Sequence, residues 1–198
     1  MELVIATTNK GKLREINELL KDLDIKVKGL AEFPGCPDVV EDGTTFRENA
    51  LKKARALAMF TGTLTLADDS GLEVDALDGE PGIHSARFSG PDADDTKNNK
   101  KLLRLLNDTP DEGRGCRFVC VLALVGPEGS GVREKVITGV VRGRVAREPA
   151  GPHGFGYDPL FFYTRAGMTF AEMGPDAKNK VSHRGRALMK LREYLKGR

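Results

Sequence analysis

Cationic residues stand at two places in this chain where a helix is expected to begin. The first is Thr7-Thr8-Asn9-Lys10-Gly11-Lys12, between a short apolar run and a series of leucines and an isoleucine at helical spacing. Backbone N–H groups at a helix start lack internal partners, and the helix dipole is positive there, so the position attracts anions. Lys10 and Lys12 are unfavourable at such a start unless an anion is bound. The pattern therefore indicates a phosphate site, and a solvated turn is the alternative.

Two acidic residues follow an expected strand over 64–67, in the sequence Asp68-Asp69-Ser70-Gly71. Neighbouring strand residues point to opposite faces, so the two carboxylates share one site only if the chain turns, and Ser-Gly favours a turn. Carboxylates at strand ends suit Mg²⁺, a hard cation that takes oxygen ligands. A further acidic loop, Glu41-Asp42-Gly43, offers a second candidate ligand. An acidic turn without a metal is the alternative.

The segment Thr45-Phe46-Arg47-Glu48 has the pattern of a capping box and predicts a helix from there to about Phe60. At about 100° per residue, Lys53 falls at the edge of the apolar stripe of this helix, with Asn49 one turn before it. Glu48 and Lys52 lie on the far face, where they can pair at i, i+4. Lys53 is therefore the lysine that can reach a site beside the core, unless it only covers apolar surface.

Late in the chain, Gly154-Phe155-Gly156-Tyr157-Asp158-Pro159 alternates glycine with aromatic residues. Glycine lets the backbone approach a ligand closely, and an aromatic ring offers a stacking face for a base. The segment 178–184 again places cations at an expected helix start, with Ser182 as a candidate cap. A tight turn with core rings and a solvated capped helix are the alternatives. In combination, these features predict a site for a nucleoside triphosphate with Mg²⁺.

The elements that must position these residues follow from periodicity and turn signals. Strands are expected at 3–7, 64–67, 117–125 and 132–145, the last two joined by a hairpin turn at 126–129. Helices are expected at about 13–23, 45–60 and 94–106, and after 182. Helices mixed with hairpin and crossover connections predict an α/β fold, with a mixed β-sheet flanked by helices, in a single domain over 1–198.

Composition excludes several classes of function. The chain has 31 Lys+Arg and 29 Asp+Glu, a net charge of +2, which argues against a protein that coats nucleic acid. No apolar run reaches the roughly 18 residues of a membrane span. Three cysteines, Cys36, Cys116 and Cys120, do not suit a disulfide framework. Cys116 and Cys120 flank an apolar run that is typical of a strand, so both are expected to be buried free thiols. We expect a cytoplasmic protein with neither nucleic acid nor membrane as a partner.

Six blocks of the sequence, in order, resemble the inosine triphosphate pyrophosphatase family, whose members are called dITP/XTP pyrophosphatases. The blocks lie at 6–12, 45–50, 67–72, 81–88, 154–159 and 182–184. The resemblance implies an ITPase-like fold with two lobes around a nucleotide cleft, and a homodimer. It also implies Mg²⁺-dependent hydrolysis of ITP, dITP or XTP between the α and β phosphates, giving the monophosphate and pyrophosphate.

The resemblance also implies roles for residues. Asp69 binds Mg²⁺ and accepts the proton of the attacking water, a role that Asp68 is able to share. Glu41 is a second candidate metal ligand, although many family members carry an acid where this chain has Val40. The residues expected to hold the triphosphate are Thr7, Thr8, Asn9, Lys10, Gly11, Lys12 and Lys53, with Ser70 also touching substrate. The residues expected to form the base pocket are Phe155, Gly156, Tyr157, Asp158, Lys178, His183 and Arg184.

Discrimination against ATP is expected from Lys178 and Arg184, as donors to a 6-keto oxygen, because a 6-amino group would leave such buried donors unpaired. Two rival functions remain. One is a pyrophosphatase of the Maf type acting on modified pyrimidine nucleotides, against which the blocks at 154–159 and 182–184 argue. The other is a nucleotide- or nucleic-acid-binding module without catalysis, which should tolerate the loss of Asp69.

Overall fold

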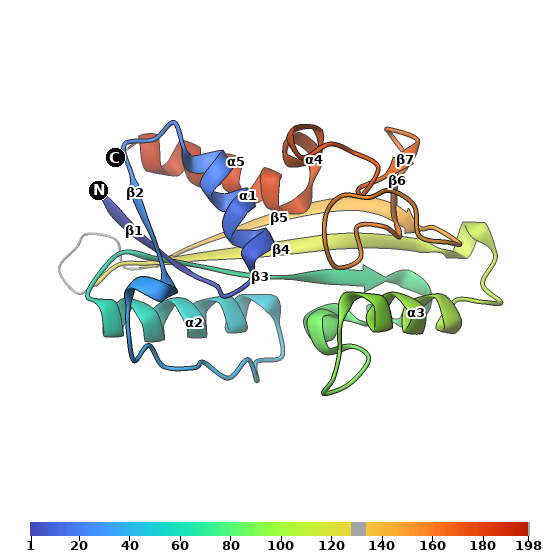
Figure 1. Ribbon diagram of the computed structural model, residues 1–198, viewed down its shortest axis with the longest axis horizontal. Helices are drawn as coiled ribbons and strands as arrows, with labels where there is room; N and C mark the ends of the chain where they lie inside the picture. Colours follow the sequence, from blue (N-terminus) through green and yellow to red (C-terminus); the bar gives the residue numbers. More distant parts are fainter. Residues whose placement is uncertain (128–133, 198) are drawn as a thin grey trace. The chain divides into compact units, whose positions relative to one another are not determined.

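The computed structural model describes residues 1–127 and 134–197, and its seven strands form one mixed sheet (Figure 1). The strand order is β2-β1-β3-β4-β5-β6-β7. Strand β1 pairs in parallel with β2 and β3, whereas β6 pairs antiparallel with β5 and β7. The strands are β1 (Glu2–Ala6), β2 (Lys26–Gly29), β3 (Thr65–Val74), β4 (Gly115–Val125), β5 (Glu134–Val145), β6 (Phe161–Tyr163) and β7 (Met168–Thr169). The predicted α/β fold with a mixed sheet is confirmed.

Five α-helices lie in the described part of the chain: α1 (Lys10–Leu20), α2 (Phe46–Thr61), α3 (Asp95–Leu105), α4 (Pro175–Val181) and α5 (His183–Lys196). Four short 3-10 helices lie at Leu30–Glu32, Asp75–Leu77, Gly82–Arg87 and Asp111–Gly113. The predicted helices at 45–60 and 94–106 are confirmed, and α1 begins three residues before the predicted position. The predicted turn at 126–129 and the first residues of the strand at 132–145 fall partly outside the described residues.

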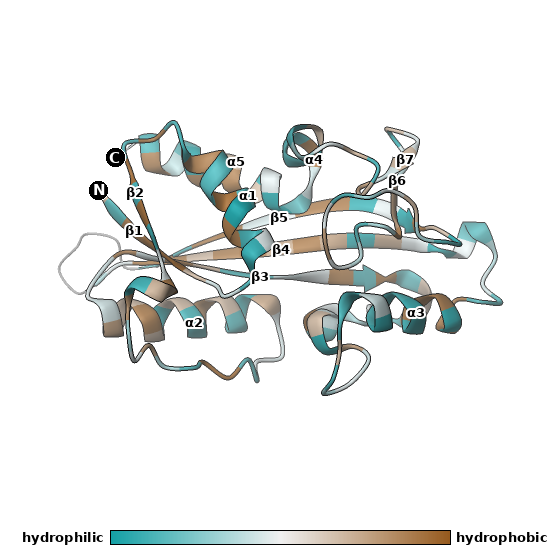
Figure 2. Cartoon of the chain, in the orientation of Figure 1, coloured by the Kyte–Doolittle hydropathy of each residue, from teal (hydrophilic) through white to brown (hydrophobic). Residues whose placement is uncertain are grey.

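The chain divides into two compact units, and the first contains residues 1–69, 120–139 and 184–198. Within it, α1 and α5 cover one face of the sheet and α2 covers the other (Figure 1). Figure 2 shows hydrophobic and hydrophilic residues together on α1 and α5, as expected for helices with one buried side. The core on that side contains Leu3, Ile5, Ile16, Leu122, Leu188 and Leu191.

The second unit contains residues 70–119 and 140–183. Its core is built around aromatic side chains: the ring centroids of Phe118 and Phe161 lie 4.6 Å apart, as do those of Phe161 and Phe170. Leu102 and Leu106, in and directly after α3, join this cluster. The nucleotide cleft and the single-domain boundary stay predictions.

The strand that carries Asp68 and Asp69 is longer than the sequence indicated. The chain was expected to turn at 68–71, but β3 continues through these residues to Val74. The expectation of a turn is therefore wrong, because pairing within the sheet keeps Ser70 and Gly71 extended. The two carboxylates consequently point to opposite faces of the sheet, as strand geometry requires.

Two further expectations concern membranes and thiols. None of the helices in the described residues is both long and apolar enough to cross a membrane. Cys116 and Cys120 are buried free thiols in β4, and Cys36 is a partly exposed free thiol. The prediction of free thiols in this strand is confirmed.

Candidate active site

The start of α1 has the predicted combination of free N–H groups and cations. Asn9 is the N-cap, and its side-chain oxygen accepts the N–H of Lys12 at 3.0 Å. The first turn holds Lys10 and Lys12 but no acidic residue. Thr7, Thr8 and Gly11 surround this start, with Thr8 exposed to solvent. The charge arrangement is confirmed, and phosphate binding by these residues stays a prediction.

Asp68 points to the face of the sheet that α1 and α5 cover. Lys12 Nζ lies 2.6 Å from Asp68 Oδ1, and Arg184 Nε lies 2.8 Å from Asp68 Oδ2. The thiol of Cys120 donates to Asp68 Oδ2 at 3.2 Å. Burial by itself raises the pKa of the Asp68 carboxyl, but the charges of Arg184 and Lys12 outweigh burial and hold that pKa well below its usual range. Asp68 is thus a permanently charged anchor for two cations.

Arg184 is buried in the first unit and joins two helices to β3. Its Nη1 lies 2.5 Å from Oε2 of Glu15, a buried residue of α1, while its Nε holds Asp68. The pKa of Arg184 is raised further, because the two carboxylates outweigh the effect of burial. Sequence reasoning missed Glu15, although an acid directly before the buried Ile16 on the helix was a usable signal. The predicted contact of Arg184 with a base is not seen in these interactions and stays a prediction.

Asp69 points to the opposite face, toward α2. Lys53 Nζ lies 3.6 Å from Asp69 Oδ1, 2.8 Å from Glu41 Oε1 and 2.9 Å from the carbonyl oxygen of Asp68. Burial raises the pKa of the Asp69 carboxyl by more than the nearby charges of Lys53 and Lys12 lower it. The placement of Lys53 beside the core and next to two acids confirms the geometric prediction from helix periodicity.

Asn49 lies one turn before Lys53 and connects the same two acidic segments. Its Oδ1 accepts the N–H of Gly43 at 2.8 Å, which holds the loop that carries Glu41. The amide also lowers the pKa of Asp69, so it lies beside that carboxyl. Asn49 Nδ2 and Asp69 Oδ2 are both buried and have no hydrogen-bond partner within the described chain. The amide donor and the carboxylate acceptor lie beside each other and can pair after a small movement, so a cation that binds Asp69 Oδ2 would compete with Asn49 for this oxygen.

These residues fit a magnesium ion. Asp69 Oδ2 is a buried carboxylate oxygen with no hydrogen-bond partner among the described residues, and the Lys53 ammonium lies near both Asp69 and Glu41. No group of three or more His, Cys, Asp or Glu in the described residues forms a ready-made metal cage. Mg²⁺ is usually bound by one or two carboxylates plus substrate phosphates and water, so two acids are enough. Asp69 and Glu41 are the residues that would hold it.

Lys52 and Glu48 do not form the expected ion pair. Lys52 Nζ instead lies 2.5 Å from Asp42 Oδ1, and Glu48 Oε2 accepts the backbone N–H of Thr44 at 2.7 Å. The expected i, i+4 pair is replaced because Glu48 completes the cap at the start of α2, where Thr45 accepts the N–H of Glu48 at 3.1 Å. Lys52 remains exposed, as predicted.

The remaining predicted residues belong to the second unit. Ser70 follows Asp69 in β3. Lys178 is buried, lies 2.5 Å from Asp158 Oδ2, and places its ammonium 4.8 Å from the centre of the Phe155 ring. The ring of His183 stacks on Phe118 with a centroid distance of 4.5 Å. Lys178, Phe155 and Asp158 are thus brought together as predicted, and their contact with a base stays a prediction.

The position of Lys178 in its helix differs from the expectation. Lys178 lies in the last turn of the separate short helix α4, where the dipole favours a cation, and not at a helix start. Helix α5 begins at His183, directly after Ser182. The first turn of α5 contains Arg184 and no acidic residue, so the predicted cationic helix start is confirmed there, but Lys178 does not belong to it because α4 is a separate helix.

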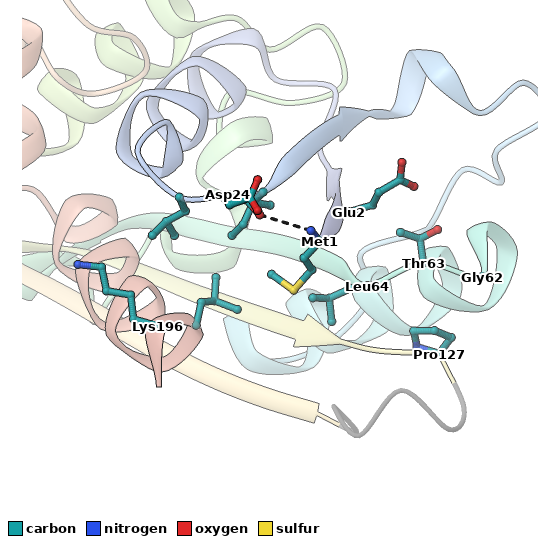
Figure 3. Close-up of a pocket in the computed structure, with 11 residues that line it drawn as sticks. Met1, Glu2, Asp24, Gly62, Thr63, Leu64, Pro127 and Lys196 are labelled. Atoms are coloured by element: carbon teal, nitrogen blue, oxygen red, sulfur yellow. Dashed lines mark hydrogen bonds between the residues drawn. The ribbon is translucent and has the colours of Figure 1, made fainter. Parts of the chain in front are cut away.

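A separate pocket lies in the first unit, beside the opposite end of β1 (Figure 3). Met1, Asp24, Leu64 and Pro127 are among the residues that line it, and the amino group of Met1 donates to the carbonyl oxygen of Asp24 at 3.4 Å. None of the predicted site residues lines this pocket. It therefore adds nothing to the candidate active site.

Fold and site together define an α/β protein in which lysines and carboxylates gather beside the carboxyl end of a parallel strand. Residues 3–194 match the Ham1 family, and the chain belongs to that family. A dITP/XTP pyrophosphatase of Desulforamulus reducens is 53% identical, over 98% of this chain and 96% of the relative.

Solved structures agree with this assignment. A HAM1 protein from Coxiella burnetii superimposes with a TM-score of 0.91 at 44% identity and covers 100% of both chains. The Ham1 protein of Staphylococcus aureus has a TM-score of 0.89 at 41% identity, covering 100% of this chain and 99% of that one. The resemblance carried by the six sequence blocks is confirmed.

Proposed function

We propose that this protein hydrolyses non-standard purine nucleoside triphosphates, namely dITP, ITP and XTP, to the monophosphate and pyrophosphate with the help of Mg²⁺. The observation that carries the proposal is the cluster around Lys53, where Asp69 presents a buried, unpartnered carboxylate oxygen. Membership of the Ham1 family and relatives called dITP/XTP pyrophosphatase support the same reaction.

The phosphate end is assigned to the first unit. Lys10, Lys12 and the N–H groups at the start of α1 supply positive charge for a triphosphate, and Lys53 adds another cation beside Asp69. Fixed positive groups of this kind stabilise charge that develops on a leaving pyrophosphate. Bound Mg²⁺ would supply further charge neutralisation at the phosphates. Asp69 and Glu41 are the proposed protein ligands.

The proton of the attacking water is assigned to Asp69 and not to Asp68. In the reaction, the water oxygen bonds to phosphorus, the α–β anhydride bond breaks and pyrophosphate leaves, while a carboxylate takes the proton. Both oxygens of Asp68 are already engaged by Lys12 and Arg184, whereas Asp69 lies on the other face and, among the described residues, pairs with a single lysine, Lys53, 3.6 Å away, so Asp69 is the proposed acceptor. The sequence left open whether Asp68 or Asp69 accepts this proton. The location of the two carboxylates on opposite faces of the sheet, with different partners, supports the choice of Asp69.

The base end is assigned to Phe155, Gly156, Tyr157, Asp158 and Lys178, with His183. The Lys178 ammonium is the proposed donor to a 6-keto oxygen, because it is buried beside the Phe155 ring. A 6-amino group would present hydrogens to this ammonium and leave it poorly paired. This arrangement favours inosine and xanthosine nucleotides over ATP.

We also propose a homodimer and a cytoplasmic location. The dimer comes from the family resemblance, and light scattering on the purified protein tests it. Buried free thiols at Cys116 and Cys120 suit a reducing compartment.

A product assay tests the reaction directly. ITP, XTP and ATP are each incubated with the protein and Mg²⁺, with an EDTA arm, and nucleotide and phosphate products are resolved separately. IMP and pyrophosphate from ITP, little change in ATP and loss of turnover with EDTA are the expected results. IDP and orthophosphate would refute cleavage at the α–β bond. A folded protein that binds ITP without turnover would favour the non-catalytic binding module.

Two neighbouring lysines provide a matched pair of variants. Lys53→Met is expected to lower kcat/KM for ITP by at least about 100-fold, the scale of losing one preorganised electrostatic group. Lys52→Met is expected to stay within about twofold, because Lys52 contacts only the exposed Asp42 among the interactions described. Equal effects of the two substitutions would contradict the assigned site.

A further inference from the structure

Helix α3 hydrogen-bonds to both backbone polar groups of Gly156 in the aromatic glycine loop. Asp95 Oδ2 accepts the N–H of Gly156 at 2.6 Å, and Asn99 Nδ2 donates to the carbonyl oxygen of Gly156 at 3.0 Å. Residues four apart lie on the same face of a helix, so Asp95 and Asn99 act on the loop together. All of these residues belong to the second unit.

The loop needs such support because of its backbone. Gly156 has a φ of +62°, and glycine enters this region without a preference that would keep it there. A Cβ built on Gly156 would meet no atom within 4 Å, so no side-chain contact at that position restrains the residue. The two hydrogen bonds from α3 restrain the peptide groups on either side of Gly156, between Phe155 and Tyr157.

The same helix also holds a second segment. Asn98 Nδ2 donates to the carbonyl oxygens of Ser85 and Ala86, at 3.3 and 3.1 Å, and Asn98 Oδ1 accepts the N–H of Ser89 at 2.8 Å. The hydroxyl of Tyr157 donates to the carbonyl oxygen of Ser85 at 2.9 Å. Consecutive residues of α3 thus join the loop at 154–158 to the segment at 85–89.

The neighbours of Gly156 are the residues assigned to the base. Phe155 donates its N–H to Asp158 Oδ2 at 2.9 Å, and that oxygen also receives the Lys178 ammonium at 2.5 Å. A rotation of the peptide groups at Gly156 would therefore displace the Phe155 ring relative to the Lys178 ammonium, which lies 4.8 Å from the ring centre. Displacements of about 1 Å in a positioning group are enough to cost large factors in rate or affinity.

The side chain of Asn99 is expected to contribute little to the free energy of unfolding. Its Oδ1 is buried and has no hydrogen-bond partner in the described residues. A buried acceptor without a partner carries a cost that offsets the gain from the Nδ2 bond. Replacing Asn99 with leucine removes both, so the fold should survive the change.

We propose that Asp95 and Asn99 are positioning residues that set base selectivity by fixing the backbone on both sides of Gly156. This inference rests on the proposed function for its kinetic consequences. It adds two residues of α3 to the determinants of specificity, and in the described part of the chain neither forms a hydrogen bond or ion pair with a predicted phosphate or metal ligand. The proposal rests on the two hydrogen bonds between α3 and the backbone of Gly156.

Four variants test the proposal: Asn99→Leu, Asp95→Ala, Asp95→Asn and the control Lys100→Ala, which alters an exposed residue next to Asn99 on the same helix. The kcat and KM for ITP and ATP are measured in the full-length protein with Mg²⁺. Asn99→Leu and Asp95→Ala are expected to reduce the ITP to ATP ratio of kcat/KM by about tenfold, mainly through KM for ITP. Asp95→Asn keeps an acceptor oxygen and should retain selectivity, as should Lys100→Ala.

Hydrogen exchange provides a readout that does not depend on activity. Peptides that contain Gly156 should exchange their amide hydrogens faster in Asn99→Leu and Asp95→Ala than in the wild type, and at the wild-type rate in the other two variants. Unchanged exchange and unchanged selectivity in Asn99→Leu and Asp95→Ala would overturn the proposal, even with a lowered melting temperature. If the wild type does not hydrolyse ITP, the proposed function fails, while the exchange comparison still decides whether α3 fixes this peptide.

Discussion

The buried interactions of Arg184 predict that Arg184→Met destabilises the fold far more than an exposed arginine would. The Arg184 guanidinium is 2% exposed and holds Asp68 at 2.8 Å and Glu15 at 2.5 Å. Methionine keeps much of the side-chain volume but leaves two buried carboxylates without the guanidinium. Removing one partner of a buried ion pair costs about 3–5 kcal/mol. For a chain of this size, that loss corresponds to a fall in melting temperature of roughly 6–20 °C.

The assay is urea unfolding of the wild type and Arg184→Met, with Arg192→Met as the control. Arg192 lies on the same helix and contacts Asp22 at 3.4 Å, but the two side chains are 29% and 62% exposed. An exposed pair of this kind contributes less than about 1 kcal/mol. The free energy of unfolding should therefore fall strongly in the first variant and hardly at all in the second.

The pH dependence of the same variant has a defined sign. In the wild type, the depressed pKa of Asp68 gives a stabilisation that is present above the unfolded pKa of about 3.9 and is lost as pH falls below it. Without Arg184, only Lys12 among the two cations still opposes the effect of burial, so the pKa of Asp68 is expected to rise and the folded variant to take up a proton more readily. The difference in free energy of unfolding between the wild type and Arg184→Met should therefore be smaller at pH 5 than at pH 8. An Arg184→Met protein that unfolds like the wild type but loses its preference for ITP would refute this reasoning and favour a role in the base pocket.

Two further predictions concern α2 and the thiols. Asn49→Asp keeps an acceptor for the Gly43 N–H but places a negative charge beside Asp69, so this variant should lose more than about tenfold in kcat for ITP with a small change in melting temperature. Gly43→Ala would place a Cβ 2.7 Å from Asn49 Oδ1 and 2.8 Å from Glu48 Cβ, so it should lower both kcat for ITP and the melting temperature. Wild-type turnover in both variants would contradict the role given to Asn49. Titration with a thiol reagent should modify Cys36 in the native protein, and Cys116 and Cys120 only after unfolding, because burial raises the pKa of both and excludes the reagent. Rapid modification of all three native thiols would count against the described packing of β4.

The sequence by itself determined the features that depend on neighbouring residues. The cap at Thr45 and the apolar stripe after it placed α2 and put Lys53 at the edge of the core, because both effects act within a few turns of one helix. The start of α1, with Asn9 as its cap and lysines in its first turn, followed from the same local rules. The family resemblance was also present in the sequence, in six short blocks.

Only the tertiary structure decided which charges meet. Arg184 and Glu15 are 169 positions apart, so no local pattern relates them, and their pairing exists because α1 and α5 cover the same face of the sheet. Asp68 and Asp69 are adjacent, yet they have different partners, because the sheet keeps β3 extended where Ser-Gly favoured a turn. The short strand β2 and helix α4 were not predicted from the sequence. Segments of four and seven residues acquire their structure from the elements they pack against, which no local pattern reveals.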